Sequence, residues 1–254
     1  MGIFVVKKKR AGLFVVCTLV LGAVFLSPGV RMVFQSGNRN LPVYSVERED
    51  NTIALTFNCA WGDEDIQSVL EALDKYNAKA TFFLVGQWAE KYPQSAKAIA
   101  DKGHELGGHS YDHKDYSKLT KQQLEEDITK TIKAIEEATD ARIKVFRAPS
   151  GSYNDDAVAA IEKSGCVPVQ WSVDTIDYGG ADCESIFRRA TEKTAAGDII
   201  LMHTGTDNTA AALPRILDSL GGKFRFSKVS DLLLTENFYV DNAGKMRKNS
   251  PSVR

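Results

Sequence analysis

The sequence predicts an α/β fold, a distorted (β/α) barrel preceded by one N-terminal apolar helix, and three observations lead to this fold class. Short apolar runs alternate with helical patterns from residue 52 to residue 234, and strands that alternate with helices form parallel sheets with crossover connections. Most residues suited to chemistry follow directly after a predicted strand, which is the rim where β/α barrels carry their active sites. A separate uncharged apolar run lies near the N-terminus.

The elements of the barrel follow from hydrophobic periodicity, because strands alternate every second residue and helices repeat every three or four. Strands are expected at residues 52–57, 80–85, 105–108, 144–146, 167–173 and 198–202. Helices are expected at residues 63–76, 88–102, 120–139, 155–164, 182–195, 208–220 and 228–234. Thr120 has the side chain of an N-cap, and Gly165 suits the end of the helix before it.

The N-terminal segment has the composition of a membrane signal. Residues 7–10 are all basic, and residues 11–26 carry no charge. At ~1.5 Å per residue this run is just short of a ~30 Å hydrocarbon core, and the basic residues before it place the N-terminus in the cytoplasm. A secretory signal has the same outline, but no convincing Ala-x-Ala cleavage site follows. We therefore expect a single-pass protein of the cell membrane with its main domain outside the cytoplasm, or a secreted protein if the segment is cleaved.

The chain divides into four predicted parts: a basic stub and signal anchor (1–30), a linker (31–50), the barrel domain (51–236) and a loose polar tail (237–254). Lys and Arg number 32 against 33 Asp and Glu, a net charge of −1, so nothing favours a nucleic-acid partner. Four scattered cysteines do not make a disulfide framework at this length, although a Cys166–Cys183 bridge stays open. The sequence predicts no oligomeric state.

Two of the four histidines, His109 and His113, lie four residues apart. On one turn of helix or in a tight loop, both imidazoles face the same way. Two neutral imidazoles are half of a zinc site, and a zinc hydrolase needs a further ligand, an open coordination position and an acid/base group. A third histidine, His203, ends the apolar run 199–202 and is therefore placed at the end of a strand.

Five short motifs, in this order, resemble those of the polysaccharide deacetylase family, also called the NodB-homology domain or carbohydrate esterase family four. The resemblance covers roughly residues 52–234, and its motifs are Thr56-Phe57-Asn58-Cys59, His109 to His113, Arg147 to Gly151, Asp174 to Tyr178 and Leu201-Met202-His203. The anchor, residues 41–46 and Ala60-Trp61-Gly62 look closest to the PdaB-like, membrane-anchored branch linked to spore formers. The resemblance implies a NodB-type barrel that hydrolyses the N-acetyl group of N-acetylhexosamine units in a cell-wall polysaccharide, peptidoglycan- or chitin-like. It also implies Zn²⁺ or another divalent transition metal.

The resemblance further implies a role for each matching residue. His109 and His113 match the family's metal ligands. His203 matches the general acid that protonates the leaving amine, and Asp177 matches the carboxylate that holds it, since a negative partner favours the imidazolium. Arg147 matches the arginine that pairs with the general base and orients it.

The first motif departs from the family, because Asn58 and Cys59 stand where the family has two aspartates. An Asn amide does not accept a proton at neutral pH, so Asn58 does not serve as the base that activates metal-bound water. For the third metal ligand, Cys59 as a thiolate, Asp63, or neither residue are the alternatives. For the base, His203 alone, Asp63 or Glu64 are the candidates.

The substrate side of the site is expected from aromatic residues beside the motifs. Of the aromatic residues Trp61, Tyr111, Tyr153, Trp171 and Tyr178, we expect only Tyr153 and Tyr178 to wall a sugar groove, because most aromatic residues of a barrel lie in its core. Leu201 of the fifth motif is placed at the same groove. The expected partners are an N-acetylated glycan polymer and, through the N-terminal helix, the membrane.

A second function, from a different class, is a catalytically weak or inactive relative that acts as a membrane-anchored glycan-binding or sporulation-related scaffold. A bound metal with an open position favours the enzyme. Asn58 packed against Arg147 favours the scaffold.

Overall fold

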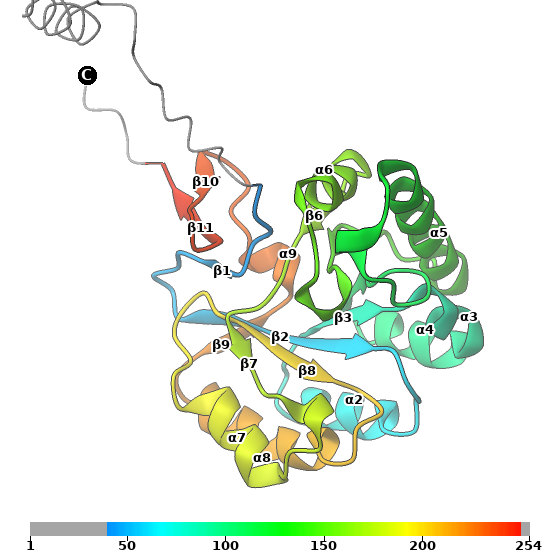
Figure 1. Cartoon of the computed structure of the whole chain (residues 1–254). Coiled ribbons are helices and arrows are strands. Elements are labelled where there is room, and N and C mark those ends of the chain that lie inside the picture. The colour runs from blue at the N-terminus through cyan, green and yellow to red at the C-terminus, as the bar shows by residue number, and fades with distance from the viewer. Residues whose placement is uncertain (1–39, 250–254) are drawn as a thin grey trace, which may run out of the picture. The chain divides into compact units, whose positions relative to one another are not determined.

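The computed structural model describes residues 40–249, and the predicted signal anchor lies outside them. Within this range an eight-stranded parallel sheet curls into a half-barrel, with helices along its outer side (Figure 1). The predicted α/β barrel is therefore confirmed. None of the helices between residues 40 and 249 combines the length and the apolar character needed to cross a membrane.

Strand β2 (Thr52–Cys59) is the centre of the sheet, whose order is β6-β5-β4-β3-β2-β8-β7 with β9 also paired to β2. The other strands are β3 (Thr81–Leu84), β4 (Glu105–Gly108), β5 (Val145–Phe146), β6 (Val167–Pro168), β7 (Val173–Asp174), β8 (Ile199–His203) and β9 (Arg225–Ser227). The register of β2 on β8 sets Asn58 opposite His203. A main-chain pairing thus brings the first and last motifs together.

The helices follow the sequence prediction closely. They are α2 (Ile66–Lys75), α3 (Gly86–Lys91), α4 (Pro93–Asp101), α5 (Lys121–Thr139), α6 (Asp155–Lys163), α7 (Cys183–Thr191), α8 (Thr209–Gly221) and α9 (Val229–Leu232). Thr120 caps α5 in a capping box with Gln123, as its residue type predicts. The single helix expected at residues 88–102 is instead two helices, because Pro93 lacks an N–H and begins a new helix at its first position.

The two faces of β2 meet different surroundings, which decides the chemistry at its end. All eight of its side chains are buried, as is usual for a parallel strand covered on both faces. The odd-numbered residues up to Cys59 pack in the larger apolar cluster with residues of α2 and α8. Since side chains alternate along a strand, Asn58 faces the interior of the barrel and Cys59 faces the helices.

Two predictions about the rest of the chain are wrong. The expected strand at residues 167–173 is interrupted and forms the separate strands β6 and β7. Residues expected in the linker and in the loose tail form a second, three-stranded sheet of β1 (Ser45–Val46), β11 (Lys245–Lys248) and β10 (Phe238–Val240). Asp241 closes the turn between β10 and β11 by accepting hydrogen bonds from the N–H groups of Ala243 and Lys245. Met246 is 2% exposed and anchors this sheet in an apolar cluster. The polar composition of the tail therefore did not prevent it from folding.

Candidate active site

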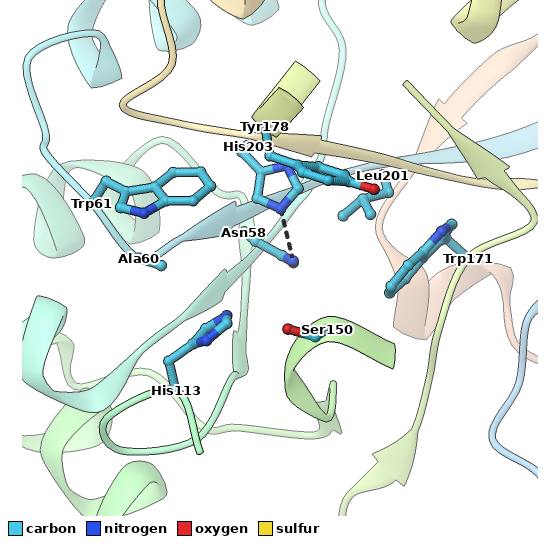
Figure 2. Close-up of a pocket in the computed structure, with 9 residues that line it drawn as sticks. All are labelled: Asn58, Ala60, Trp61, His113, Ser150, Trp171, Tyr178, Leu201 and His203. Carbon is cyan, nitrogen blue, oxygen red and sulfur yellow. Dashed lines mark hydrogen bonds between the residues drawn. The ribbon is translucent and has the colours of Figure 1, made fainter. Parts of the chain in front are cut away.

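The motif residues meet at the carboxyl ends of the strands. Asn58 is in β2, Arg147 follows β5, and His203 ends β8. Asp177 lies in a 3-10 turn, η3 (Asp177–Gly179), that follows β7. Because parallel strands end on the same rim of a barrel, four motifs that are far apart in the sequence form one site, part of which is drawn in Figure 2.

His203 is fixed by the buried carboxylate of Asp177. One carboxylate oxygen accepts a hydrogen bond from His203 Nδ1 at 2.8 Å, and the other accepts from the His203 backbone N–H and the Thr209 hydroxyl, both at 2.6 Å. Burial alone would raise the pKa of Asp177, but the hydrogen bonds that its carboxylate accepts from His203 and Thr209 outweigh burial and hold this pKa below its usual value. The structure thus places Asp177 as the partner that the resemblance implies.

Arg147 lies fully buried beneath Asn58. Its Nη1 donates to Asn58 Oδ1 at 2.9 Å, and its Nη2 donates to the carbonyl oxygen of Gln170 at 3.0 Å. The guanidinium carbon is 4.0 Å from the centroid of the Phe83 ring. Among residues 40–249, no carboxylate forms an ion pair with Arg147, and burial lowers the pKa of its guanidinium. The arrangement is a buried cation whose partner is a neutral amide.

His109 and His113 converge, as their spacing predicts. Their ring centroids are 5.1 Å apart, with the planes at 79°. His109 Nδ1 is 2.8 Å from the carbonyl oxygen of Arg147, so Nδ1 carries the proton, because a carbonyl only accepts. Its Nε2 is buried and has no protein partner in the described range. Burial, reinforced by His113, holds the pKa of His109 well below its usual value, and burial also lowers the pKa of His113. Both rings are therefore neutral at pH 7, the form that binds metals.

Neither Cys59 nor Asp63 is in place as a third metal ligand, which is the last of the three alternatives that the sequence left open. Within residues 40–249, no three His, Cys, Asp or Glu side chains are close enough to hold a metal ion together. Cys59 faces the apolar helix layer, where burial raises the pKa of its thiol and disfavours the thiolate that binds zinc. Asp63 instead accepts a hydrogen bond from the Ser95 hydroxyl at 2.6 Å. The residues present therefore do not fit a catalytic zinc site with three protein ligands.

A pocket of about 230 Å³ opens above Asn58 (Figure 2). It is lined by Asn58, Ala60, Trp61, His113, Ser150, Trp171, Tyr178, Leu201 and His203. The rings of Trp61 and Tyr178 flank the His203 imidazole, with centroids 5.3 and 5.2 Å from it. Since pockets for drug-sized ligands usually measure 300–1,000 Å³, this one suits a single small unit, such as one sugar of a polymer.

The structure places some of the expected groove residues at the pocket and others away from it. Tyr178 and Leu201 line the pocket. Tyr153 does not line it, because its hydroxyl is 3.0 Å from the Tyr44 hydroxyl, away from the pocket. Trp61 and Trp171, which we expected in the core, are walls of the pocket. Trp61 comes two residues after the end of β2, so the rule that located the motifs could also have located it, whereas Trp171 lies between β6 and β7, inside the single strand expected at residues 167–173.

Two loops of the pocket are joined by Asp65, at the start of α2. Its Oδ1 accepts a hydrogen bond from the Gly205 N–H at 2.8 Å, in the loop after His203. Gly205 has a φ of 70°, and a Cβ there would lie 2.8 Å from the backbone nitrogen of Gly62. This close approach, which only glycine allows, holds Trp61 beside His203.

Comparisons with known proteins agree with this fold. The family model for polysaccharide deacetylase matches residues 45–169. The YlxY protein of Bacillus subtilis, described as uncharacterized, is 36% identical over 193 residues, which cover 76% of this chain and 60% of that protein. A peptidoglycan-N-acetylglucosamine deacetylase of Bacillus cereus is 33% identical over 196 residues, which cover 75% of this chain and 92% of that protein. The chain thus spans about three fifths of YlxY, and it spans 55% of a second Bacillus cereus deacetylase.

Solved structures include both active and inactive relatives. Wild-type BA3943 from Bacillus anthracis, described as a CE4 family pseudoenzyme, aligns with a TM-score of 0.73 and 33% identity over 75% of this chain and 68% of that one. A BA3943 mutant described as having restored enzymatic activity aligns with the same TM-score and identity, over 75% of this chain and 70% of that one. The Bc1960 peptidoglycan N-acetylglucosamine deacetylase aligns with a TM-score of 0.73 and 30% identity, over 76% of this chain and 93% of that one.

Proposed function

This chain belongs to the polysaccharide deacetylase family, and we propose that it recognises an N-acetylhexosamine unit of a cell-wall glycan and deacetylates it only at a residual rate. One observation carries the proposal. The sugar-sized pocket and the His203–Asp177 pair are intact, while Asn58, bonded to Arg147, occupies the place of the base. Recognition and hydrolysis use different residues, so one can persist without the other.

Recognition is supported by the chemistry of the pocket walls. Trp61, Trp171 and Tyr178 offer aromatic faces, which pack well against the apolar faces of sugar rings. The Asn58 amide, the Ser150 hydroxyl and the two lining imidazoles supply polar groups for an acetamide and for hydroxyls. Relatives named peptidoglycan N-acetylglucosamine deacetylases, which are hydrolases of amide bonds, support the same ligand class.

Slow hydrolysis is supported by two separate defects. An amide does not take a proton from water at neutral pH, so Asn58 supplies no base. The side chain at Cys59 is turned into the apolar core, which leaves only His109 and His113 as candidate metal ligands within residues 40–249. What the chain's own residues do is bind the sugar, orient its acetamide next to His203, and exclude water with the aromatic walls. The pseudoenzyme description of a structural neighbour is a precedent for such a member.

A second candidate is a metal-dependent deacetylase, as the motifs alone predict. It is favoured by one observation, the buried His109 Nε2 that finds no protein partner in the part of the chain the structure describes and that lies next to His113. Metal analysis of the purified chain separates the candidates. About one zinc per chain, lost on His109→Ala, supports the enzyme, and no retained zinc supports the glycan-binding relative.

For localisation we propose a domain outside the cytoplasm, tethered by residues 11–26, because that is where cell-wall glycan lies. Protease added to intact cells should then cleave the barrel domain. Full-length chain recovered in the cytosol without processing would contradict this placement.

The proposed recognition is tested by calorimetric titration of the full chain with an N-acetylglucosamine tetramer and with the same tetramer after complete deacetylation. We expect binding of the acetylated form, weakened about tenfold by Trp61→Ala. The matched control is Tyr239→Ala, because Tyr239 is an aromatic residue of β10 with similar exposure that does not line the pocket. Equal affinity for both tetramers, or no binding of either at millimolar concentration, would overturn the proposal.

A further inference from the structure

Four side chains form one continuous row of hydrogen bonds through the site. Arg147 Nη1 is 2.9 Å from Asn58 Oδ1, Asn58 Nδ2 is 3.4 Å from His203 Nε2, and His203 Nδ1 is 2.8 Å from Asp177 Oδ1. The contact between Asn58 and His203 is the dashed line in Figure 2. Both ends of the row have a fixed polarity, because a guanidinium only donates hydrogen bonds and an ionised carboxylate only accepts them.

The two fixed ends of the row determine which atoms of Asn58 and His203 carry protons. Since Arg147 must donate, the Asn58 atom that faces it is the oxygen, and the NH2 group of the amide must turn toward His203. At the other end, the Asp177 carboxylate accepts, so His203 Nδ1 carries a proton. His203 Nε2 then faces an N–H donor and has to act as the acceptor. This assignment uses the chemistry of the groups and not the position of any hydrogen atom.

We propose that Asn58 is a positioning residue that holds His203 as the neutral tautomer protonated at Nδ1, so that its Nε2 accepts a proton and does not donate one. The family's general acid must donate a proton to the leaving amine. The residue at position 58 therefore removes the base and also disables the acid beside it in the same pocket.

The other groups around the imidazole leave this arrangement undisturbed. The rings of Trp61 and Tyr178 flank His203, and the Thr209 hydroxyl bonds to Asp177. The nearby titratable groups are His109 and His113 of the loop after β4, both discussed above as neutral. At 3.4 Å the bond from Asn58 is long and weak, but its direction matters more than its strength. A proton on Nε2 would place two N–H groups face to face, because Arg147 prevents the amide from turning over.

The substitution Asn58→Asp reverses this polarity. A carboxylate bonded to Arg147 by one oxygen presents its other oxygen to His203 Nε2, and that oxygen accepts a hydrogen bond. The imidazole can then carry both protons between two carboxylates. An opposite charge at this distance shifts a protonation equilibrium by one to three powers of ten. The ratio of doubly to singly protonated His203 at a given pH should therefore rise about tenfold or more.

Nitrogen NMR of the full chain labelled with ¹⁵N-histidine tests the inference. The chain has only four histidines, and His203→Gln identifies the signals of His203. In the wild type at pH 7 we expect a protonated Nδ1 and an unprotonated Nε2. In Asn58→Asp at the same pH, both nitrogens should be protonated to a much larger extent. Asn58→Leu, of similar size but without a donor, should keep the proton on Nδ1, because Asp177 is unchanged, and should no longer oppose a second proton on Nε2.

Two results would overturn the inference: a wild-type His203 with its proton on Nε2, or the same protonation of His203 in wild type and Asn58→Asp between pH 6 and pH 8. The wild-type spectrum alone tests the tautomer, so the test does not depend on a variant that folds. The inference concerns proton positions without a bound glycan, and its failure would leave the proposed recognition standing.

Discussion

Replacing Asn58 by aspartate should stabilise the folded protein at pH 7, which is unusual for a new buried charge. The wild type buries the Arg147 guanidinium completely and gives it only neutral acceptors, Asn58 Oδ1 and the Gln170 carbonyl. The cost of removing this cation from water is thus already present in the wild type. Asn58→Asp places a carboxylate at the same position, 2.9 Å from Nη1 if the geometry is kept.

The magnitude follows from two opposing terms. Two unit charges about 4 Å apart attract by about 4 kcal/mol at an effective dielectric constant of about 20. Moving a carboxylate out of water costs several kcal/mol when it is deeply buried, and this cost offsets much of the attraction, because Asn58 is only 3% exposed even though it borders the pocket. A charged hydrogen bond also contributes about 1.5–3 kcal/mol, against about 1 kcal/mol for a neutral one. We expect the free energy of unfolding to rise by about 1–2 kcal/mol.

Urea unfolding at pH 7, followed by circular dichroism, measures this difference. Asn58→Leu is the matched control, and it should destabilise the protein by about 1–3 kcal/mol, because Nη1 of Arg147 loses its acceptor. Arg147 holds the pKa of the new carboxyl group below its unfolded value of about 3.9. The gain is therefore present above that pH and is lost as the pH falls through the folded-state pKa. An Asn58→Asp variant less stable than wild type at pH 7, with an unchanged m value, would refute the reasoning.

Three other variants test separate parts of the account. Burial lowers the pKa of His104 from an ordinary 6.5 to about 4, so the unfolded chain binds more protons between these values and stability falls as the pH drops through them. His104→Gln should remove up to about 3 kcal/mol of that loss between pH 7 and pH 4, measured by urea titration at both values. Asp177→Asn should cost about 2–4 kcal/mol at pH 7, and the deficit should narrow as acid protonates the wild-type carboxyl, whose pKa His203 holds low. Asp65→Ala should weaken tetramer binding about 3–10-fold and lower the melting temperature by only a few degrees, because the Gly205 loop, which packs against the Trp61 loop, loses one hydrogen bond worth about 1 kcal/mol.

Much of the fold was predictable because its signals are local. The alternation of β2, the capping box at Thr120 and the helix spacing of residues 66–73 each follow from neighbours in the sequence. The motif residues were located for the same reason, since each lies at or shortly after the end of a strand. Their meeting at one rim is a consequence of parallel topology.

The parts that could not be predicted depend on contacts between distant segments. The polar tail folds because Met246 inserts into an apolar cluster and β11 pairs with β1, which no local pattern reveals. Tyr153 was misplaced because its neighbour Tyr44 is 109 residues away in the sequence. The sequence left open the direction in which the Cys59 side chain points, because it did not show which face of the strand lies toward the barrel interior. Once Asn58 faces the barrel interior, alternation alone turns Cys59 toward the helices.

The central claim is that this chain has kept glycan recognition and has lost most hydrolysis at positions 58 and 59. Acetate release from a saturating N-acetylglucosamine tetramer, with zinc supplied, tests it most directly when wild type is compared with the double variant Asn58→Asp/Cys59→Asp. The account predicts a wild-type rate lower by about 10²–10⁴-fold, the usual worth of general acid/base catalysis. It predicts no increase for Cys59→Asp alone, because the base is still missing. A wild-type rate equal to that of the double variant, at equal zinc content, would contradict the account.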